Sequence, residues 1–282
     1  MFTIVSKRVL NDSMTLMVVD APFIAKKALP GQFIILRVNE KGERIPLTVA
    51  DYDRDAGTIT IIYQKVGKTT MLLDELNAGD CIQDFIGPLG KASELEGYKK
   101  VAVLGGGAGC AIAYPQAKAL HELGAQVDMI AGFRSTDLII LEEEMRAASH
   151  NLIVMTDDGS NGNKGFVTDA LSAQMKVGAN YDLVVAIGPL FMMKAVCALT
   201  EPLGIKTLVS MNPIMIDGTG MCGGCRVTVD GKTQFACVDG PDFDGHLVDF
   251  DEAILRSKAY QAEERQAIEE YKCRLTGGKC NV

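Results

Sequence analysis

The chain has 282 residues, of which 48% are hydrophobic, and its formal net charge is -8 with an isoelectric point near 5.0. This length allows two globular domains and a small third element. The acidic balance excludes a nucleic-acid-binding protein, because such a protein needs a basic face. No run approaches the roughly 18 apolar residues that span a bilayer, and the N-terminal stretch lacks the apolar core of a signal peptide. We therefore expect a cytoplasmic protein.

Residues 1 to 98 predict an antiparallel β-barrel. Short alternating or apolar runs follow one another, and turn sequences such as Pro30-Gly31, Ala56-Gly57 and Gly87-Pro88 separate them. One short helix, from about Thr69 to Leu76, is expected to interrupt these strands.

Residues 99 to 211 predict a five-stranded, parallel, doubly wound sheet, because apolar strands alternate with helical patterns. The expected strands are Val101–Leu104, Val127–Ala131, Leu152–Met155, Leu183–Ile187 and Thr207–Ser210. The expected helices are one that Pro115 starts in its first turn and those at Asp137–Ala148, Val167–Met175 and Leu190–Leu203.

A glycine turn follows the first of these strands. Gly106, Gly107 and Gly109 expose backbone N–H groups where a helix begins, which favours the pyrophosphate of a dinucleotide. Glycine turns also serve plain packing, and Cys110 breaks the usual fingerprint, so the packing alternative stays open. Asp157 and the Gly188-Pro189 turn follow two other strands at their carboxyl ends, where ligands bind in open α/β sheets.

Residues 212 to 282 contain three of the eight cysteines, Cys222, Cys225 and Cys237, in the spacing C-x2-C-x11-C. Two metal sites fit this pattern. In one, the cysteines and Asp217, which stands where a plant-type cluster loop has its first cysteine, hold a 2Fe-2S cluster. In the other, the cysteines and His246 hold zinc. The plant-type spacing favours iron and sulfur, although Asp217-Gly218 is also an ordinary turn dipeptide.

The remaining cysteines are scattered, which fits a reducing compartment better than a disulfide framework. They are Cys81, Cys110, Cys197, Cys273 and Cys280. After the cysteine loop, the stretch from Asp251 to Leu275 is strongly helical by propensity and is expected to pack one face on a domain or a partner.

The order of short motifs along the whole chain resembles the ferredoxin-NADP reductase superfamily. The motifs are PGQF (30–33), RIPLT (44–48), VGKTT (66–70), GPLG (87–90), GGGAG (105–109), DDGS (157–160), GP (188–189) and the cysteine loop. Within the superfamily the chain is similar to the iron–sulfur flavoprotein branch. That branch includes the small subunits of NADH-dependent reduced ferredoxin:NADP oxidoreductases and the electron-transfer subunits of dihydroorotate dehydrogenase.

The resemblance implies FAD, NAD(H) and a 2Fe-2S cluster as cofactors, and it assigns residues to each. The flavin contacts fall on Arg44, Pro46, Leu47, Thr48, Ile62, Tyr63, Gln64, Thr69 and Thr70. The nicotinamide nucleotide falls on Gly106, Gly107, Ala108, Gly109, Asp157, Gly188 and Pro189. Most members of the dihydroorotate branch have four cysteines in the cluster loop, whereas Asp217 takes the first place here, as in the reductase small subunits that the chain resembles.

The function implied is an electron-transfer flavoprotein subunit of an oxidoreductase. Electrons would pass between NAD(H), FAD and the 2Fe-2S cluster and a larger partner subunit, with ferredoxin reached through that partner. No catalytic side chain is expected, since the cofactors carry the chemistry. Two alternatives remain: pairing with a dihydroorotate-oxidising subunit, and a zinc-stabilised structural protein for assembly.

Overall fold

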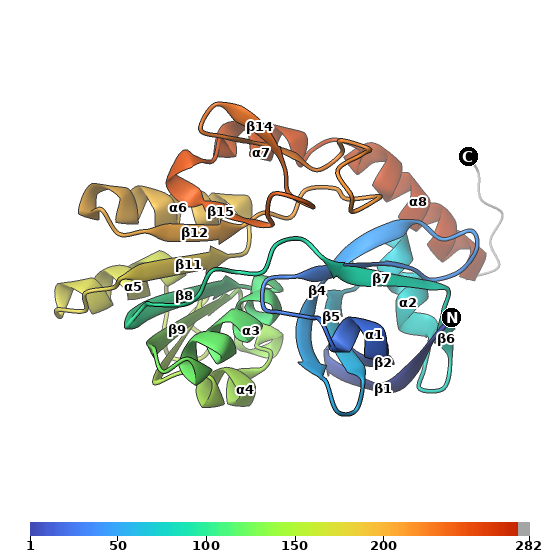
Figure 1. Cartoon of the computed structure of the whole chain (residues 1–282), viewed down its shortest axis with the longest axis horizontal. Coiled ribbons are helices and arrows are strands. Elements are labelled where there is room, and N and C mark those ends of the chain that lie inside the picture. The colour runs from blue at the N-terminus through green and yellow to red at the C-terminus, as the bar shows by residue number, and fades with distance from the viewer. Residues whose placement is uncertain (276–282) are drawn as a thin grey trace.

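The computed structural model describes residues 1–275, and the predicted scattered thiol Cys280 lies outside them. Two sheets lie side by side, and the C-terminal segment runs across both of them (Figure 1). Among the described residues, no helix has the length and apolar character needed to cross a bilayer.

The first sheet is a nearly closed antiparallel barrel, as predicted. Its strands are β1 (Phe2–Asn11), β2 (Met14–Asp20), β3 (Phe33–Arg37), β4 (Arg44–Asp53), β5 (Thr58–Gln64), β6 (Cys81–Ile82) and β7 (Asp84–Leu89), with helices α1 (Pro22–Ala25) and α2 (Lys68–Glu75). They are ordered β6-β1-β2-β5-β4-β3-β7. The alternation along β5 buries Ile59, Ile61 and Tyr63 inside the barrel, because successive side chains of a strand point to opposite faces.

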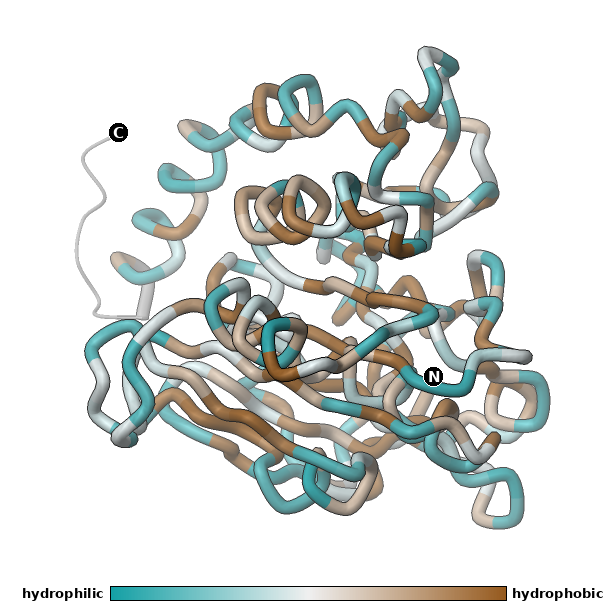
Figure 2. Tube along the Cα trace, turned by 90° about the vertical axis from the view of Figure 1, so that its left-hand side faces the viewer, coloured by the Kyte–Doolittle hydropathy of each residue, from teal (hydrophilic) through white to brown (hydrophobic). Residues whose placement is uncertain are grey.

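The second sheet contains the five predicted parallel strands. They are β8 (Lys100–Gly106), β9 (Gln126–Phe133), β10 (Asn151–Thr156), β11 (Leu183–Ile187) and β12 (Thr207–Ser210). The helices that cover them are α3 (Gly109–Glu122), α4 (Glu142–Ala147), α5 (Val167–Lys176) and α6 (Leu190–Thr200), with 3-10 turns η1 (Thr136–Leu138) and η2 (Glu201–Leu203). Every residue of β11 is buried, which is typical of a strand covered on both faces. Figure 2 shows brown, apolar stretches of the chain inside the molecule and mainly hydrophilic turns at its rim.

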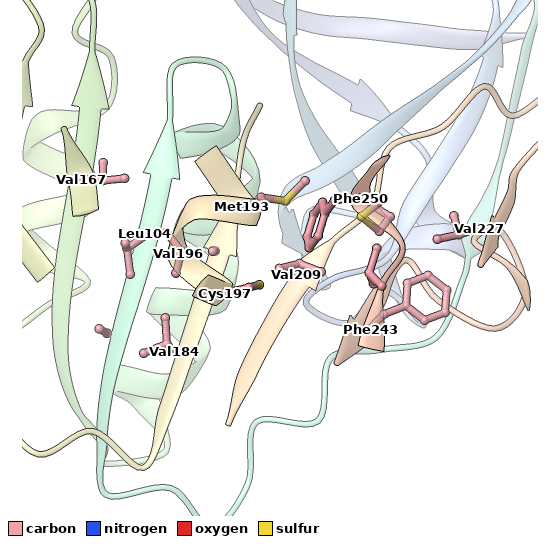
Figure 3. Packing of buried hydrophobic residues seen from close by; sticks show 14 of the residues in the cluster. Leu104, Val167, Val184, Met193, Val196, Cys197, Val209, Val227, Phe243 and Phe250 are labelled. Carbon is pink, nitrogen blue, oxygen red and sulfur yellow. The ribbon is translucent and has the colours of Figure 1, made fainter. Parts of the chain in front are cut away.

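A sixth strand, β15 (Asp242–Asp244), completes this sheet in the order β10-β9-β8-β11-β12-β15 and runs antiparallel to β12. The sequence did not predict it, because three residues reading Asp-Phe-Asp carry no usable periodicity. Figure 3 shows its Phe243 packed with Val209 of β12 and Phe250. The segment after residue 211 thus contributes to the sheet, and the predicted domain boundaries remain predictions.

Two predicted helix starts were wrong. Helix α3 begins at Gly109 rather than at Pro115, because the amides of Cys110 and Ala111 already bond to the carbonyls of Gly107 and Ala108, at 3.1 Å each. The predicted helix over residues 137–148 is a 3-10 turn followed by α4, with Leu141 between them in a left-handed conformation at φ 54°.

The rest of the C-terminal segment forms a hairpin, a turn and two helices. They are the hairpin strands β13 (Arg226–Val229) and β14 (Lys232–Phe235), the turn η3 (Gly245–Leu247), and helices α7 (Phe250–Arg256) and α8 (Gln261–Leu275). The predicted long helix is therefore two helices, and Tyr260 between them has a left-handed φ of 65°. As expected, α8 packs on a domain: it lies along α2, where the Tyr271 hydroxyl bonds to Glu75 (Figure 1).

Candidate functional site

A cavity of about 1060 Å³ lies between the barrel and the parallel sheet. It gathers most of the residues that the sequence analysis assigned to cofactors. Those that line it are Pro46, Leu47, Thr48, Ile62, Tyr63, Gln64, Gly106, Gly107, Ala108, Gly109, Asp157, Gly188 and Pro189. Stretches of the barrel and of the parallel sheet that are far apart in the chain thus form a single cavity, large enough for a drug-sized or dinucleotide ligand.

The barrel contributes its wall through β4 and β5. Pro46, Leu47 and Thr48 are each partly exposed there. The Tyr63 ring instead belongs to the barrel core, where its hydroxyl donates to Oδ1 of Asp74 at 3.1 Å. Burial is the main cause that raises the pKa of Tyr63, so this hydroxyl stays protonated. Ile62 and Gln64, which alternate with Tyr63, point the other way.

Three predicted flavin contacts do not line the cavity. The Arg44 side chain is exposed at the start of β4. The Thr69 hydroxyl donates to Glu43 at 3.4 Å, and the Thr70 hydroxyl accepts from the amide of Gly67 at 3.0 Å. Thr70 therefore holds the first turn of α2, and its role toward a phosphate stays a prediction.

The glycine turn closes tightly against the neighbouring strand. A Cβ on Gly109 would lie 2.3 Å from the carbonyl oxygen of Ile187, and one on Gly106 would lie 2.6 Å from the Met192 sulfur. Gly109 thus needs to be glycine, because the atoms that its Cβ would meet belong to the backbone, whereas the flexible Met192 side chain beside Gly106 can move. The same turn starts the 14-residue helix α3 beside the cavity. Packing and anion binding, which the sequence left as alternatives, are compatible here.

Cys110, next in the chain, is fully buried. Burial raises the pKa of its thiol to about 12. This effect is larger than any lowering of the pKa by the nearby start of helix α3. It is a protonated core thiol.

The other nucleotide-side residues lie at the carboxyl ends of the strands. Asp157 is exposed, and its amide donates to the carbonyl of Phe133 at 3.0 Å. A Cβ on Gly188 would lie 3.1 Å from the backbone of Gly106, so the two turns are in contact. Asp157, the Gly188-Pro189 turn and the glycine turn thus line one cavity at the carboxyl ends of their strands, where ligands bind in open α/β sheets.

Several cavity residues were not predicted. Ile254 and Ser257 come from α7 and its C-cap, and Phe166 and Phe191 are 63% and 69% exposed at the cavity. An exposed phenylalanine can be assigned to a binding site only when the three-dimensional structure shows which residues surround it. The C-terminal helical stretch had no pattern that pointed to a ligand.

The cysteine loop brings two of its predicted ligands together. The sulfurs of Cys225 and Cys237 are both buried and lie 3.2 Å apart, and burial raises the pKa of the Cys237 thiol to about 12. Cys222 is exposed, with the Gly224 amide 3.5 Å from its sulfur. Within residues 1–275, no three metal-binding side chains are grouped around one point. Thiol sulfurs and amides aimed at sulfur are nevertheless the groups that iron–sulfur clusters use.

Asp217 caps the turn of this loop. One carboxylate oxygen accepts from the amide of Thr219 at 2.9 Å and the other from the amide of Cys222 at 2.6 Å. The Thr219 bond is the main cause that holds the pKa of Asp217 below its usual range, so the group is ionised. His246, the ligand in the zinc alternative, lies with Nε2 2.9 Å from the hydroxyl of Thr200.

Comparison with known proteins matches residues 212–249 to the iron–sulfur cluster binding domain of dihydroorotate dehydrogenase B. A dihydroorotate dehydrogenase B (NAD(+)) electron transfer subunit homolog of Thermotoga maritima is 46% identical, over 90% of this chain and 89% of its own. The electron transfer subunit of Geobacillus thermodenitrificans is 33% identical, over 86% of this chain and 95% of its own. The chain belongs to this family of electron-transfer subunits.

A solved structure extends the match to three dimensions. A chain of an NADH-dependent reduced ferredoxin-NADP oxidoreductase, studied for flavin-based electron bifurcation, superposes on this electron-transfer subunit with a TM-score of 0.91. It is 44% identical, over 95% of this chain and 97% of that one. At the level of the family, these matches confirm an oxidoreductase electron-transfer subunit with the ferredoxin-NADP reductase fold and with FAD, NAD(H) and a 2Fe-2S cluster as cofactors.

Proposed function

We propose that this chain is the small subunit of an NADH-dependent reduced ferredoxin:NADP oxidoreductase of the electron-bifurcating type. It passes electrons between NAD(H) and a larger flavin and iron–sulfur subunit, through which ferredoxin is reached. One observation supports this most: a barrel and a glycine turn build one cavity, and the same chain carries the cysteine loop. Its scattered cysteines and its use of NAD(H) fit a cytoplasmic location.

The predicted cofactor residues have separate roles in this proposal. Pro46 to Thr48 and the stretch Ile62 to Gln64, in which the Tyr63 ring stays in the barrel core, hold the flavin ring. Arg44, Thr69 and Thr70, which do not line the cavity, are assigned to the phosphates. Gly106 to Gly109 bind the nicotinamide nucleotide through backbone N–H groups at the start of α3, where the helix dipole favours a pyrophosphate. Asp157 and the Gly188-Pro189 turn orient it.

The cysteine loop holds the cluster in this proposal, with Asp217, Cys222, Cys225 and Cys237 as its ligands. When bound, FAD supplies the conversion between two-electron and one-electron transfer. The chain itself supplies no acid or base. It binds and orients the cofactors, and it excludes water from them.

Purification of the native complex tests the proposal. The native complex is purified, its flavin is extracted, and NADH is added under anaerobic conditions while the absorption and the electron paramagnetic resonance spectrum are recorded. We expect FAD, reduction by NADH, and a 2Fe-2S signal, with a larger ferredoxin-reducing subunit co-purifying. FMN or no flavin, or a colourless zinc protein, would contradict it.

A second candidate is the electron-transfer subunit of an NAD-dependent dihydroorotate dehydrogenase. It is favoured by the similarity of this chain to dihydroorotate dehydrogenase B electron transfer subunits. The two candidates share cofactors and differ in the partner. Dihydroorotate-dependent reduction by the purified complex would favour this second candidate.

A further inference from the structure

A carboxyl group is enclosed where three parts of the chain meet, behind the wall of the cavity. Asp242 on β15 accepts through Oδ2 from the Ser93 hydroxyl at 2.5 Å and from Nε2 of Gln116 at 3.0 Å. Ser93 lies in the connection from the barrel to the parallel sheet, and Gln116 is a fully buried residue of α3. The group therefore joins the cysteine-bearing segment to both other parts of the molecule.

Two oxygens at this point have no partner among the described residues. They are Oδ1 of Asp242 and Oε1 of Gln116, and both are buried, although Asp242 as a whole residue is partly exposed. The same two side chains already share one hydrogen bond. An ionised carboxylate and an amide oxygen can each only accept, so with an ionised Asp242 both oxygens stay unsatisfied, which is costly. A single proton on Oδ1 can donate to Oε1 and satisfies both.

The surroundings of the carboxyl are neutral. The groups that donate to it are the Ser93 hydroxyl and the Gln116 amide, both of them uncharged. Burial is the main cause that raises the pKa of Asp242, and it outweighs the hydrogen bonds that lower this pKa. None of the charged or titratable side chains on the surrounding elements forms a described hydrogen bond or ion pair with it; these are Lys91, Glu94, Tyr114, Lys118, His121, Glu122 and Asp244.

We propose that Asp242 is a neutral carboxylic acid in the folded protein, joined to the Gln116 amide by two hydrogen bonds in a closed pair. The pair positions β15, and with it the segment that carries the cysteine loop, against α3.

The carboxyl group lies next to residues of the cavity wall. Ser210, which pairs with Asp242 from β12, and the adjacent Pro241 both line the cavity. The amide of Met211 also donates to the Pro241 carbonyl at 2.9 Å. The proposal needs no assumption about which cofactor binds.

Infrared spectroscopy of the wild-type protein gives the first test. We expect a carbonyl band of a protonated carboxylic acid at neutral pH, which shifts when the protein is grown with carbon-13-labelled aspartate. The band should disappear in Asp242→Asn and persist in Asp244→Asn, a matched control two residues along the same strand. No isotope-sensitive acid band in the folded wild type would overturn the proposal, whether or not the variant folds.

The pH dependence of unfolding gives the second test. Asp242→Asn keeps both hydrogen bonds, because the asparagine N–H replaces the acid O–H, so its melting temperature should stay close to that of the wild type. Gln116→Leu removes both partners and should melt several degrees lower. An acid whose pKa is raised by folding loses stability relative to a neutral analogue as pH rises above its unfolded value, about 4, until it reaches the folded value. The wild type should therefore lose stability relative to Asp242→Asn over that range. The opposite slope would indicate an ionised carboxylate and would overturn the proposal.

Discussion

At the scale of single residues, the structure separates side chains that face the cavity from those that hold the scaffold. Tyr63 and Asp74 are an example. Thr15 donates to Asp74 at 2.7 Å, and Lys7 and Lys65 lie 3.6 and 3.4 Å from it. Burial alone would raise the pKa of Asp74, but these bonds and charges hold it below its usual value. Asp74 thus anchors α2 to the barrel, beside the predicted flavin stretch.

Asp217 is the residue for which the sequence and the geometry suggest different roles. If it is a cluster ligand, Asp217→Cys should keep the 2Fe-2S centre with a shifted potential and a changed resonance signal, because ligand identity tunes the cluster. Asp217→Ala should leave the cluster labile or absent. His246→Ala is the control and should leave it intact, since this imidazole bonds to Thr200. A full cluster with an unchanged spectrum in Asp217→Ala would show that Asp217 only caps the turn.

Cys110 gives a second prediction at this scale. A buried thiol with a raised pKa is a poor nucleophile and a poor redox group. Cys110→Ala should therefore reduce its flavin with NADH within about threefold of the wild-type rate, as measured by stopped-flow absorption. Gly109→Ala should fail in the same assay, because its Cβ would meet the Ile187 carbonyl. Loss of flavin reduction in Cys110→Ala with FAD still bound would contradict this.

At the scale of elements, the C-terminal helices connect the three parts of the chain. Helix α7 lines the cavity with Ile254, bonds through Arg256 to the carbonyl of Gly224 in the cysteine loop at 3.2 Å, and is followed by α8 on the barrel. A segment with no chemical motif therefore joins the ligand cavity to the loop.

The position of α7 predicts a measurable effect on binding. Ile254→Ala removes apolar wall from the cavity and should raise the dissociation constant of the nucleotide or of FAD by about three- to tenfold. Leu255→Ala is the matched control, because Leu255 is 69% exposed on the same helix and does not line the cavity. Fluorescence titration of each variant with both ligands measures the effect. Equal constants in the two variants would argue against a role for α7.

At the scale of the whole molecule, the cavity is shared by the barrel and the parallel sheet, and the Asp242 contacts tie both to the C-terminal segment. A ligand in the cavity therefore stabilises the assembly of the parts rather than one of them. Lys118 of α3 also bridges to Asp51 of β4 at 2.9 Å, a contact between the sheet layer and the barrel.

This shared cavity predicts cooperative unfolding. Addition of FAD to the flavin-free protein at a hundredfold excess over Kd should stabilise it by about 2.7 kcal/mol. Scanning calorimetry should show one transition that moves as a unit. Two transitions, of which FAD moves only one, would mean that the barrel and the sheet unfold independently.

The sequence by itself determined the local elements and the chemistry of the cysteine loop. Alternating burial along β5 and the unbroken apolar run of β11 are local patterns, so their strands could be predicted from residues that are neighbours in the chain. The spacing of Cys222, Cys225 and Cys237 was informative for the same reason. The same patterns predicted the order of barrel and sheet and the glycine turn, and the resemblance then supplied the residues on the flavin side of the cavity.

Only the tertiary structure decided the rest. Ser93 and Gln116 are 149 and 126 residues from Asp242, and no local pattern marks any of the three. β15 is too short to have a period, and it becomes a strand because the edge of β12 offers it hydrogen bonds. Ile254 of α7 lines the cavity because the C-terminal segment runs back across the two sheets. Such contacts form between segments that folding brings together, and their energies depend on neighbours that the linear sequence does not place side by side.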